Sequence, residues 1–118
     1  MTEQYPFTDL PSLDENIMQP LKELLGDAFD KLVTDYLTSF PDKLAELKLA
    51  AQSDDVKTLL QISHTLKSSS GSFGFIRLYK RLEHLEYQAR NNDIANSTGQ
   101  VSLIDQEFND ILNHLDNS

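Results

Sequence analysis

The sequence predicts an all-α protein, an antiparallel up-down four-helix bundle with a short N-terminal helical extension. Apolar residues recur at steps of three and four, and the 118 residues contain only four glycines and four prolines. No segment shows the alternation that is typical of a strand. A chain of this length builds one domain around one core, so we expect a single domain over residues 1–118. We place the bundle core at about residues 27–116 and the extension at residues 1–26.

A short helix and a long helix come first. Ser12 and Glu15 have the spacing of a capping box, which predicts that a short helix opens there. Gly26 ends that helix, and Asp27 is the expected N-cap of the next one. The apolar stripe stays in phase across Pro41, so we expect one kinked helix rather than two. The stripe consists of Phe29, Leu32, Val33, Tyr36, Leu37, Phe40, Leu44, Leu47 and Ala51.

Three shorter helices complete the predicted bundle. The first begins after a cap at Ser53 or Asp54, and the segment from Gly71 to Gly74 is the expected turn into the second. Residues 91–93 separate the second from the third, and the short connections make neighbours antiparallel. The apolar positions, helix by helix, are Val56, Leu59, Leu60, Ile62, Leu66 and Phe73, then Phe75, Leu78, Leu82, Leu85 and Ala89, then Val101, Ile104, Phe108, Ile111, Leu112 and Leu115.

Composition argues against several classes of protein. There is no cysteine, which removes disulfides and thiolate metal sites. No apolar stretch approaches the roughly 20 residues that span a bilayer. The N-terminus, with Glu3, Pro6 and Asp9, does not resemble a signal peptide. We therefore expect a cytoplasmic protein without membrane contact, and the net charge of −9 disfavours nucleic acid as a partner.

Basic side chains gather in one segment without acids. Residues 56–82 contain no Asp or Glu, whereas they hold half of the ten Lys and Arg residues. These are Lys57, Lys67, Arg77, Lys80 and Arg81. A locally basic region on an acidic protein suits an acidic partner surface. Ordinary patchiness of a charged surface explains the pattern equally well.

His64 lies opposite the apolar side of its predicted helix, so we expect its imidazole to face water. The residues that share its helix face are Leu60, Lys67, Ser68 and Gly71. The last two are small, which leaves room for a partner to approach. The Lys67 ammonium would offset the roughly two negative charges of a phosphoryl group on this histidine. A solvated His and Lys on a helix surface is the ordinary alternative.

Glu86 lies close to the apolar stripe of the following helix, where a carboxylate needs a hydrogen-bonding partner. In a hairpin that turns near residues 73–75, position 86 comes level with position 64. The carboxylate could then accept a hydrogen bond from Nδ1–H of His64. That bond would fix the tautomer and leave Nε2 as the nucleophile. The alternative is a glutamate at the edge of the core whose carboxylate reaches solvent.

At these residues the chain resembles the histidine-containing phosphotransfer (HPt) domains of bacterial two-component phosphorelays. The resemblance runs from about Leu13 to Leu115, with its specific part in residues 63–86. Ser68 departs from the glycine that is frequent there, but serine is also small. The family pattern of His-x-x-Lys-Gly, small residues, Gly and then Leu is matched by His64-Thr65-Leu66-Lys67-Ser68, Gly71, Phe73-Gly74 and Leu78.

The resemblance implies a role for each of these residues. His64 would be the phospho-acceptor, Lys67 would neutralise the phosphate, and Glu86 would orient the histidine ring. Gly71 and Gly74 match small positions that clear the docking face and form the turn. Together with two neighbours these glycines form the expected docking set, which is Leu60, Ser68, Gly71 and Gly74.

The resemblance also implies a mechanism and partners. The protein would carry a phosphoryl group on a histidine between the aspartates of response-regulator receiver domains, in a relay fed by a hybrid sensor histidine kinase. The receiver supplies Mg²⁺, and the chain needs no cofactor of its own. We expect a monomeric phosphocarrier without kinase activity, the latter because no nucleotide-binding loop of P-loop type is present. The short ends, with no long linker, favour a free-standing carrier over a module of a hybrid kinase.

The residues also bear on three other functions. A metal enzyme is disfavoured because His64, His84 and His114 lie on three different predicted helices and no H-E-x-x-H pair exists. A serine hydrolase is disfavoured because the serines at 68–72 lack a G-x-S-x-G elbow after a strand. A helical interaction module whose histidine is never phosphorylated stays open.

Overall fold

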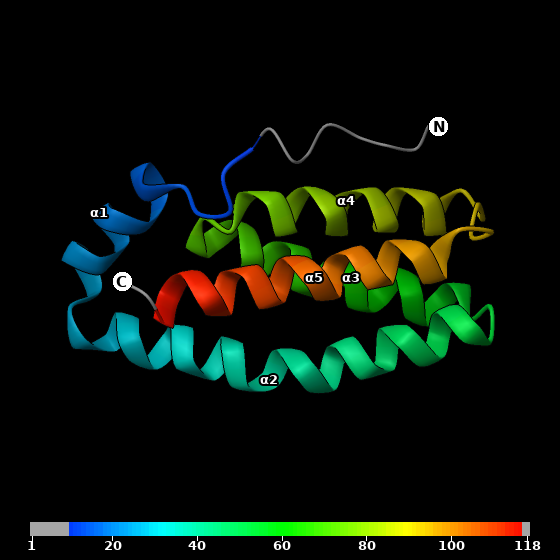
Figure 1. The fold of residues 1–118 in the computed structure, drawn as a ribbon, viewed down its shortest axis with the longest axis horizontal. Helices are drawn as coiled ribbons and strands as arrows, with labels where there is room; N and C mark the ends of the chain where they lie inside the picture. Colours follow the sequence, from blue (N-terminus) through cyan, green and yellow to red (C-terminus); the bar gives the residue numbers. More distant parts are fainter. Residues whose placement is uncertain (1–9, 117–118) are drawn as a thin grey trace.

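The computed structural model describes residues 10–116, and this part of the chain folds into five α-helices without a strand (Figure 1). The helices are α1 (Glu15–Leu25), α2 (Asp27–Gln52), α3 (Val56–Phe73), α4 (Ile76–Arg90) and α5 (Ser97–Asp116). Helices α2 and α4 each pack against both α3 and α5, which gives an up-down bundle, while α1 packs against α2 and α3 at one end. The predicted fold class is confirmed. The first part of the extension, with Glu3, Pro6 and Asp9, lies outside the described residues.

The core forms where the apolar stripes of the four bundle helices meet. Phe40 of α2 stacks on Phe108 of α5, with ring centroids 4.2 Å apart. Tyr36, Phe73 and Phe75 form a second aromatic group toward the α1 end, with centroids 5.4 to 5.8 Å apart. Each fully buried side chain of this size stabilises the fold by about 2 kcal/mol. The second group packs beside the turn that follows α3, because Phe73 ends α3 and Phe75 precedes α4.

The apolar stripe of α2 is predicted correctly except at one residue. The helix passes through Pro41 without interruption, so it is one helix as expected, and Figure 1 shows it gently curved. Leu32, however, is 46% exposed. The buried positions Phe29, Val33 and Tyr36 follow one another at three- and four-residue steps, and Leu32 lies beside that line.

The predicted helix starts are wrong by one or two residues. Helix α1 is capped by Asp14, whose carboxylate accepts from the backbone N–H of Asn16, and not by Ser12. The reason is tertiary, because the backbone N–H of Asp14 donates to the carbonyl of Gly74 at 2.8 Å and fixes where the helix begins. Gly26, with φ of 57°, ends α1 and also caps α2, so Asp27 is already helical.

The start and end of α3 also differ from the prediction. Its N-cap is Asp55, which accepts from the backbone N–H of Thr58, rather than Ser53 or Asp54. The helix then continues to Phe73, so the turn consists of two residues and does not start at Gly71. Gly74 takes the left-handed conformation, with φ of 84°, that ends the helix.

A search of residues 10–116 finds no helix with both the length and the apolar character needed to cross a bilayer.

Candidate functional site

Helix α3 holds His64 on its outer face. Ser63, one residue before it, and Leu66, two residues after it, face the core and are buried. The His64 side chain is 61% exposed, as its helical phase predicts. The imidazole is therefore open to a partner while its backbone is fixed by a packed helix.

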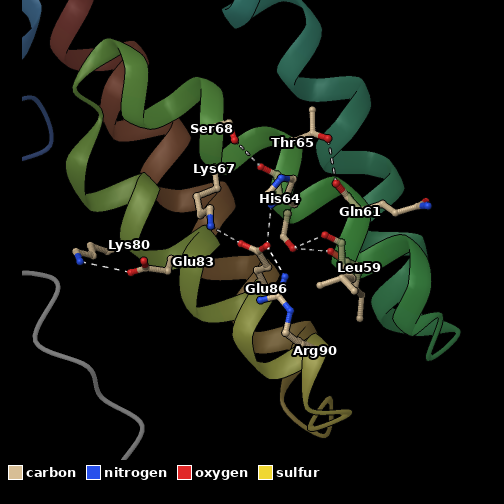
Figure 2. Close-up of polar contacts among 12 residues, drawn as sticks. Leu59, Gln61, His64, Thr65, Lys67, Ser68, Lys80, Glu83, Glu86 and Arg90 are labelled. Carbon is tan, nitrogen blue, oxygen red and sulfur yellow. Dashed lines mark hydrogen bonds and ion pairs between the residues drawn. The ribbon is translucent and has the colours of Figure 1, made fainter.

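The carboxylate of Glu86 on α4 is the centre of the site (Figure 2). His64 Nδ1 lies 2.8 Å from Oε2, and Lys67 Nζ lies 2.7 Å from Oε1. Arg90, one turn further along α4, places Nη2 3.0 Å from Oε2. Only 3% of the Glu86 side chain is exposed. A nearly buried carboxylate is thus bonded to three donors from two helices.

These contacts set the charge of Glu86. Burial raises the pKa of its carboxyl, but hydrogen bonds from Lys67, His64 and Arg90 outweigh burial and lower the pKa to about 2. An ionised carboxylate can only accept hydrogen bonds, so the Nδ1 atom that faces it carries the hydrogen. In the neutral form of the ring, the Nε2 atom then keeps its lone pair. The register of the α3–α4 hairpin brings Glu86 and His64 together as the sequence predicts.

The sequence predicts the Lys67 ammonium beside His64, whereas in the structure it is bonded to a carboxylate. The carboxylate is that of Glu86, and the Lys67 side chain is only 21% exposed. The hydrogen bond to Glu86 raises the pKa of Lys67. The lysine and the histidine occupy the two different oxygens of one carboxylate (Figure 2). Glu86 therefore holds both side chains, not the histidine alone.

Serine and threonine hydroxyls around His64 are bonded within α3. Ser63 donates to the carbonyl of Leu59 at 2.6 Å, and Ser68 donates to the carbonyl of His64 at 3.3 Å. Each serine from 68 to 72 makes a bond of this kind to the residue four positions earlier. These residues are compact, satisfied within the helix and do not interrupt it.

Gly71 also has a role in helix packing. A Cβ atom built on it would lie 2.9 Å from Cδ1 of Tyr79, closer than side chains pack. The missing side chain therefore makes room for a ring of α4 and does not simply clear an outer face. The glycine brings the two helices that carry His64 and Glu86 close together.

The other expected docking residues divide into exposed and buried positions. Ser68 is exposed, Leu60 is half-buried and packs against the core, and Gly74 is buried. A Cβ atom on Gly74 would lie 3.0 Å from the carbonyl oxygen of Asp14 and 3.1 Å from Cβ of Ile17. Gly74 thus joins the turn to α1 and offers no surface to a partner, because α1 covers it.

The basic segment is largely neutralised inside the molecule. Arg81 is buried and donates through Nε to Glu107 Oε2 of α5 at 3.0 Å. Arg77 reaches the same carboxylate at 3.5 Å and also donates to the carbonyl of Leu10 at 3.0 Å. These arginines cross-link elements of the fold, so the expected basic docking surface is weaker than the sequence suggests. The cause is Glu107, which is distant in sequence.

Two features of the site were missed from the sequence. Arg90 stands four residues after Glu86, a spacing that favours an ion pair on a helix and could have drawn attention to it. Glu107 gave no such signal. The Nε2 atom of His84 is buried in the structure.

Two open hollows adjoin the site, and Lys67 lines both. One, of about 590 Å³, extends from Lys67 and Ser68 past Tyr79 to Ile17 of α1. The other, of about 560 Å³, extends along α4 to Arg90. Within residues 10–116, no three His, Cys, Asp or Glu side chains gather as a metal site would require.

Comparison with known proteins adds two findings. A protein-family model described as Hpt domain matches residues 31–117. The fold is similar to the crystal structure of histidine-containing phosphotransfer protein B (HptB) from Pseudomonas aeruginosa PAO1, with a TM-score of 0.80 and 24% sequence identity over 84% of this chain and 86% of that chain. No curated protein matches the sequence.

Proposed function

The chain belongs to the Hpt domain family, whose members are phosphocarriers of two-component relays, and we propose that His64 is its phospho-acceptor. In this proposal the protein takes a phosphoryl group from the aspartate of one receiver domain and gives it to the aspartate of another. The observation that carries the proposal is the bond from Nδ1 of the exposed His64 to the buried carboxylate of Glu86.

That bond prepares the histidine as a nucleophile. Because Nδ1–H is held by Glu86, the lone pair of Nε2 is available and the ring cannot turn freely. This arrangement resembles the use of a carboxylate to orient a catalytic histidine. Orientation and charge neutralisation are the main contributions a protein makes to phosphoryl transfer.

Transfer forms one bond to phosphorus and breaks another. The Nε2 lone pair attacks phosphorus in line, the bond between phosphorus and the aspartyl oxygen breaks, and the receiver's carboxylate leaves with that electron pair. The new N–P bond leaves the imidazole ring with one positive charge while Nδ1 keeps its proton. Glu86 Oε2, 2.8 Å from Nδ1, stabilises that charge. Return of the group to a second receiver reverses each change.

The docking face, in this proposal, is the part of α3 around His64 together with the hollow that reaches α1. Ser68 lies on this face, and Ile17 of α1 forms the far wall of the hollow. Gly71 lines the hollow, while Leu60 and Gly74 support the face from within by packing against the core and α1. A receiver with an apolar helix beside its aspartate fits such a surface.

We propose a monomeric, cytoplasmic carrier that forms one domain over residues 1–118, has no kinase activity and receives its phosphoryl group from a hybrid sensor kinase through a receiver domain. The competing function is a helical interaction module whose histidine is never phosphorylated. The two differ in one measurable property, the covalent labelling of His64.

The test uses a receiver domain labelled with radioactive phosphate on its aspartate. We expect the label to move to this protein in a bond that acid breaks and base does not, and we expect His64→Gln to abolish it. His114→Gln is the matched control, since His114 is an exposed histidine on α5. Labelling that survives His64→Gln overturns the assignment. If no receiver of the source organism labels the wild-type protein, the interaction module is the better account.

A further inference from the structure

Lys67 has two groups that compete for its charge once His64 is phosphorylated. In the structure its ammonium is 2.7 Å from Oε1 of Glu86. The family role expected of this lysine is to neutralise a phosphoryl group. The same ammonium is already the partner of a carboxylate of which only 3% is exposed.

The two acceptors lie on different sides of the imidazole. Nδ1 faces Glu86, so a phosphoryl group on Nε2 stands on the side of the ring that faces away from the carboxylate. The Lys67 ammonium is bonded to the carboxylate itself. The ammonium that would neutralise the phosphoryl group is therefore held by the other acceptor.

We propose that Glu86 withholds Lys67 while His64 is unmodified, and that the arrival of a phosphoryl group moves Lys67 from Glu86 to the phosphoryl oxygens. This inference rests on the proposed function of His64. It makes Glu86 a positioning residue for the lysine as well as for the histidine.

The charges around Glu86 explain why the exchange can occur. Before transfer, the carboxylate has Lys67 and Arg90 as its cations. After transfer, the phosphorylated ring carries a positive charge and donates from Nδ1 to Oε2. The ring then replaces Lys67 as the second cation, while Arg90 stays in place. Two cations therefore face the Glu86 carboxylate both before and after the exchange.

A double-mutant cycle between Lys67 and Glu86 tests the exchange. Glu86→Gln keeps an oxygen that accepts from Nδ1–H but removes the charge that holds Lys67. Lys67→Met keeps most of the stem but removes the ammonium. The readout is the single-turnover rate at which each of the four proteins accepts phosphate from a receiver that labels the wild type. We expect Lys67→Met to slow acceptance about three- to tenfold more in the Glu86→Gln background than in the wild type.

Other results of the cycle overturn the proposal. An equal effect of Lys67→Met in both backgrounds means that Glu86 does not restrain the lysine. A smaller effect with glutamine present means that Glu86 presents Lys67 to the phosphate instead. Lys80→Met is the matched control, because Lys80 lines the same hollow but pairs with Glu83 and not with Glu86. Its effect should be the same in both backgrounds.

A second measurement does not depend on a partner or on the stability of the glutamine variant. The ammonium of Lys67 is followed by ¹⁵N NMR in the wild-type protein, before and after phosphorylation of His64 by phosphoramidate. We expect its signal to shift on phosphorylation and the Nδ1 hydrogen bond to persist. An unchanged Lys67 signal in protein that is fully phosphorylated overturns the exchange, yet it leaves His64 as the acceptor.

Discussion

Glu86 is almost fully buried, and it is charged because donors from two helices surround it. Desolvation of an unpaired carboxylate would be costly, whereas here Lys67, His64 and Arg90 all bond to it. At the scale of single residues, this one carboxylate therefore connects the histidine, the lysine and the arginine of the site.

The charge of Glu86 predicts a dependence of stability on pH. Its pKa is about 2 in the folded protein against an ordinary value of 4.5. A carboxyl whose pKa is lowered by folding stabilises the fold fully above the ordinary value, and this contribution is lost as pH falls toward the folded value. Between pH 4.5 and 2 the wild type should therefore lose on the order of 1–3 kcal/mol more unfolding free energy than Glu86→Gln. Urea unfolding at a series of pH values measures this loss, and parallel curves for the two proteins contradict it.

The site could be predicted from the sequence only in part at this scale. Helical phase places His64 outward, and hairpin register places Glu86 beside it. The position of the Lys67 ammonium could not be predicted, because a flexible side chain goes to the strongest available acceptor. That choice depends on the burial of Glu86, which the assembled core determines.

Helices α3 and α4 form the element that brings the site together. Their link is only the pair Gly74 and Phe75, and Gly71 lets the ring of Tyr79 lie against α3. Close approach of the two helices is what allows Glu86 to reach both His64 and Lys67.

The close approach of α3 and α4 predicts that Gly71→Ala has opposite effects on stability in the wild type and in the Tyr79→Ala variant. Alanine at position 71 should gain up to about 1 kcal/mol from its helix propensity when nothing obstructs it. In the wild type its Cβ would meet Tyr79 Cδ1 at 2.9 Å, so Gly71→Ala should be neutral or destabilising. With Tyr79→Ala also present, the same change should stabilise the fold. Denaturant unfolding of the four proteins measures this, and equal gains in both backgrounds would show that the ring does not restrict position 71.

Element type could be predicted much better than element ends. The periodicity of apolar residues identifies all five helices, including the long α2 that runs through Pro41. The observed N-caps differ from the predicted ones because several polar residues near each helix start can serve as an N-cap. Tertiary bonds such as that from Asp14 to Gly74 select among them.

Across the whole molecule, a buried ion cluster ties distant segments together. Glu107 of α5 binds Arg81 and Arg77 of α4, and Arg77 also bonds to the carbonyl of Leu10 before α1. The cluster removes two arginines from the surface that a partner could meet. It could not be predicted from the sequence, because no local pattern links position 107 to positions 77 and 81.

Loss of this cluster should destabilise the whole fold. Glu107→Gln removes the carboxylate that pairs with the buried Arg81 and the partly exposed Arg77, which should lower the unfolding free energy by about 3–5 kcal/mol. Asp35→Asn, which breaks the exposed pair with Lys31, is the control and should change it by less than about 0.5 kcal/mol. Urea unfolding separates the two effects. Similar small losses for both variants would mean that the cluster adds little.

The central claim is that Nε2 of His64 accepts the phosphoryl group while Glu86 holds Nδ1–H. NMR of protein with ¹⁵N-labelled histidine, phosphorylated by a receiver domain, tests it most directly. We predict a phosphorus coupling to Nε2 of His64 and a retained proton on Nδ1. A coupling to Nδ1, or to a nitrogen of His84 or His114, would contradict the account.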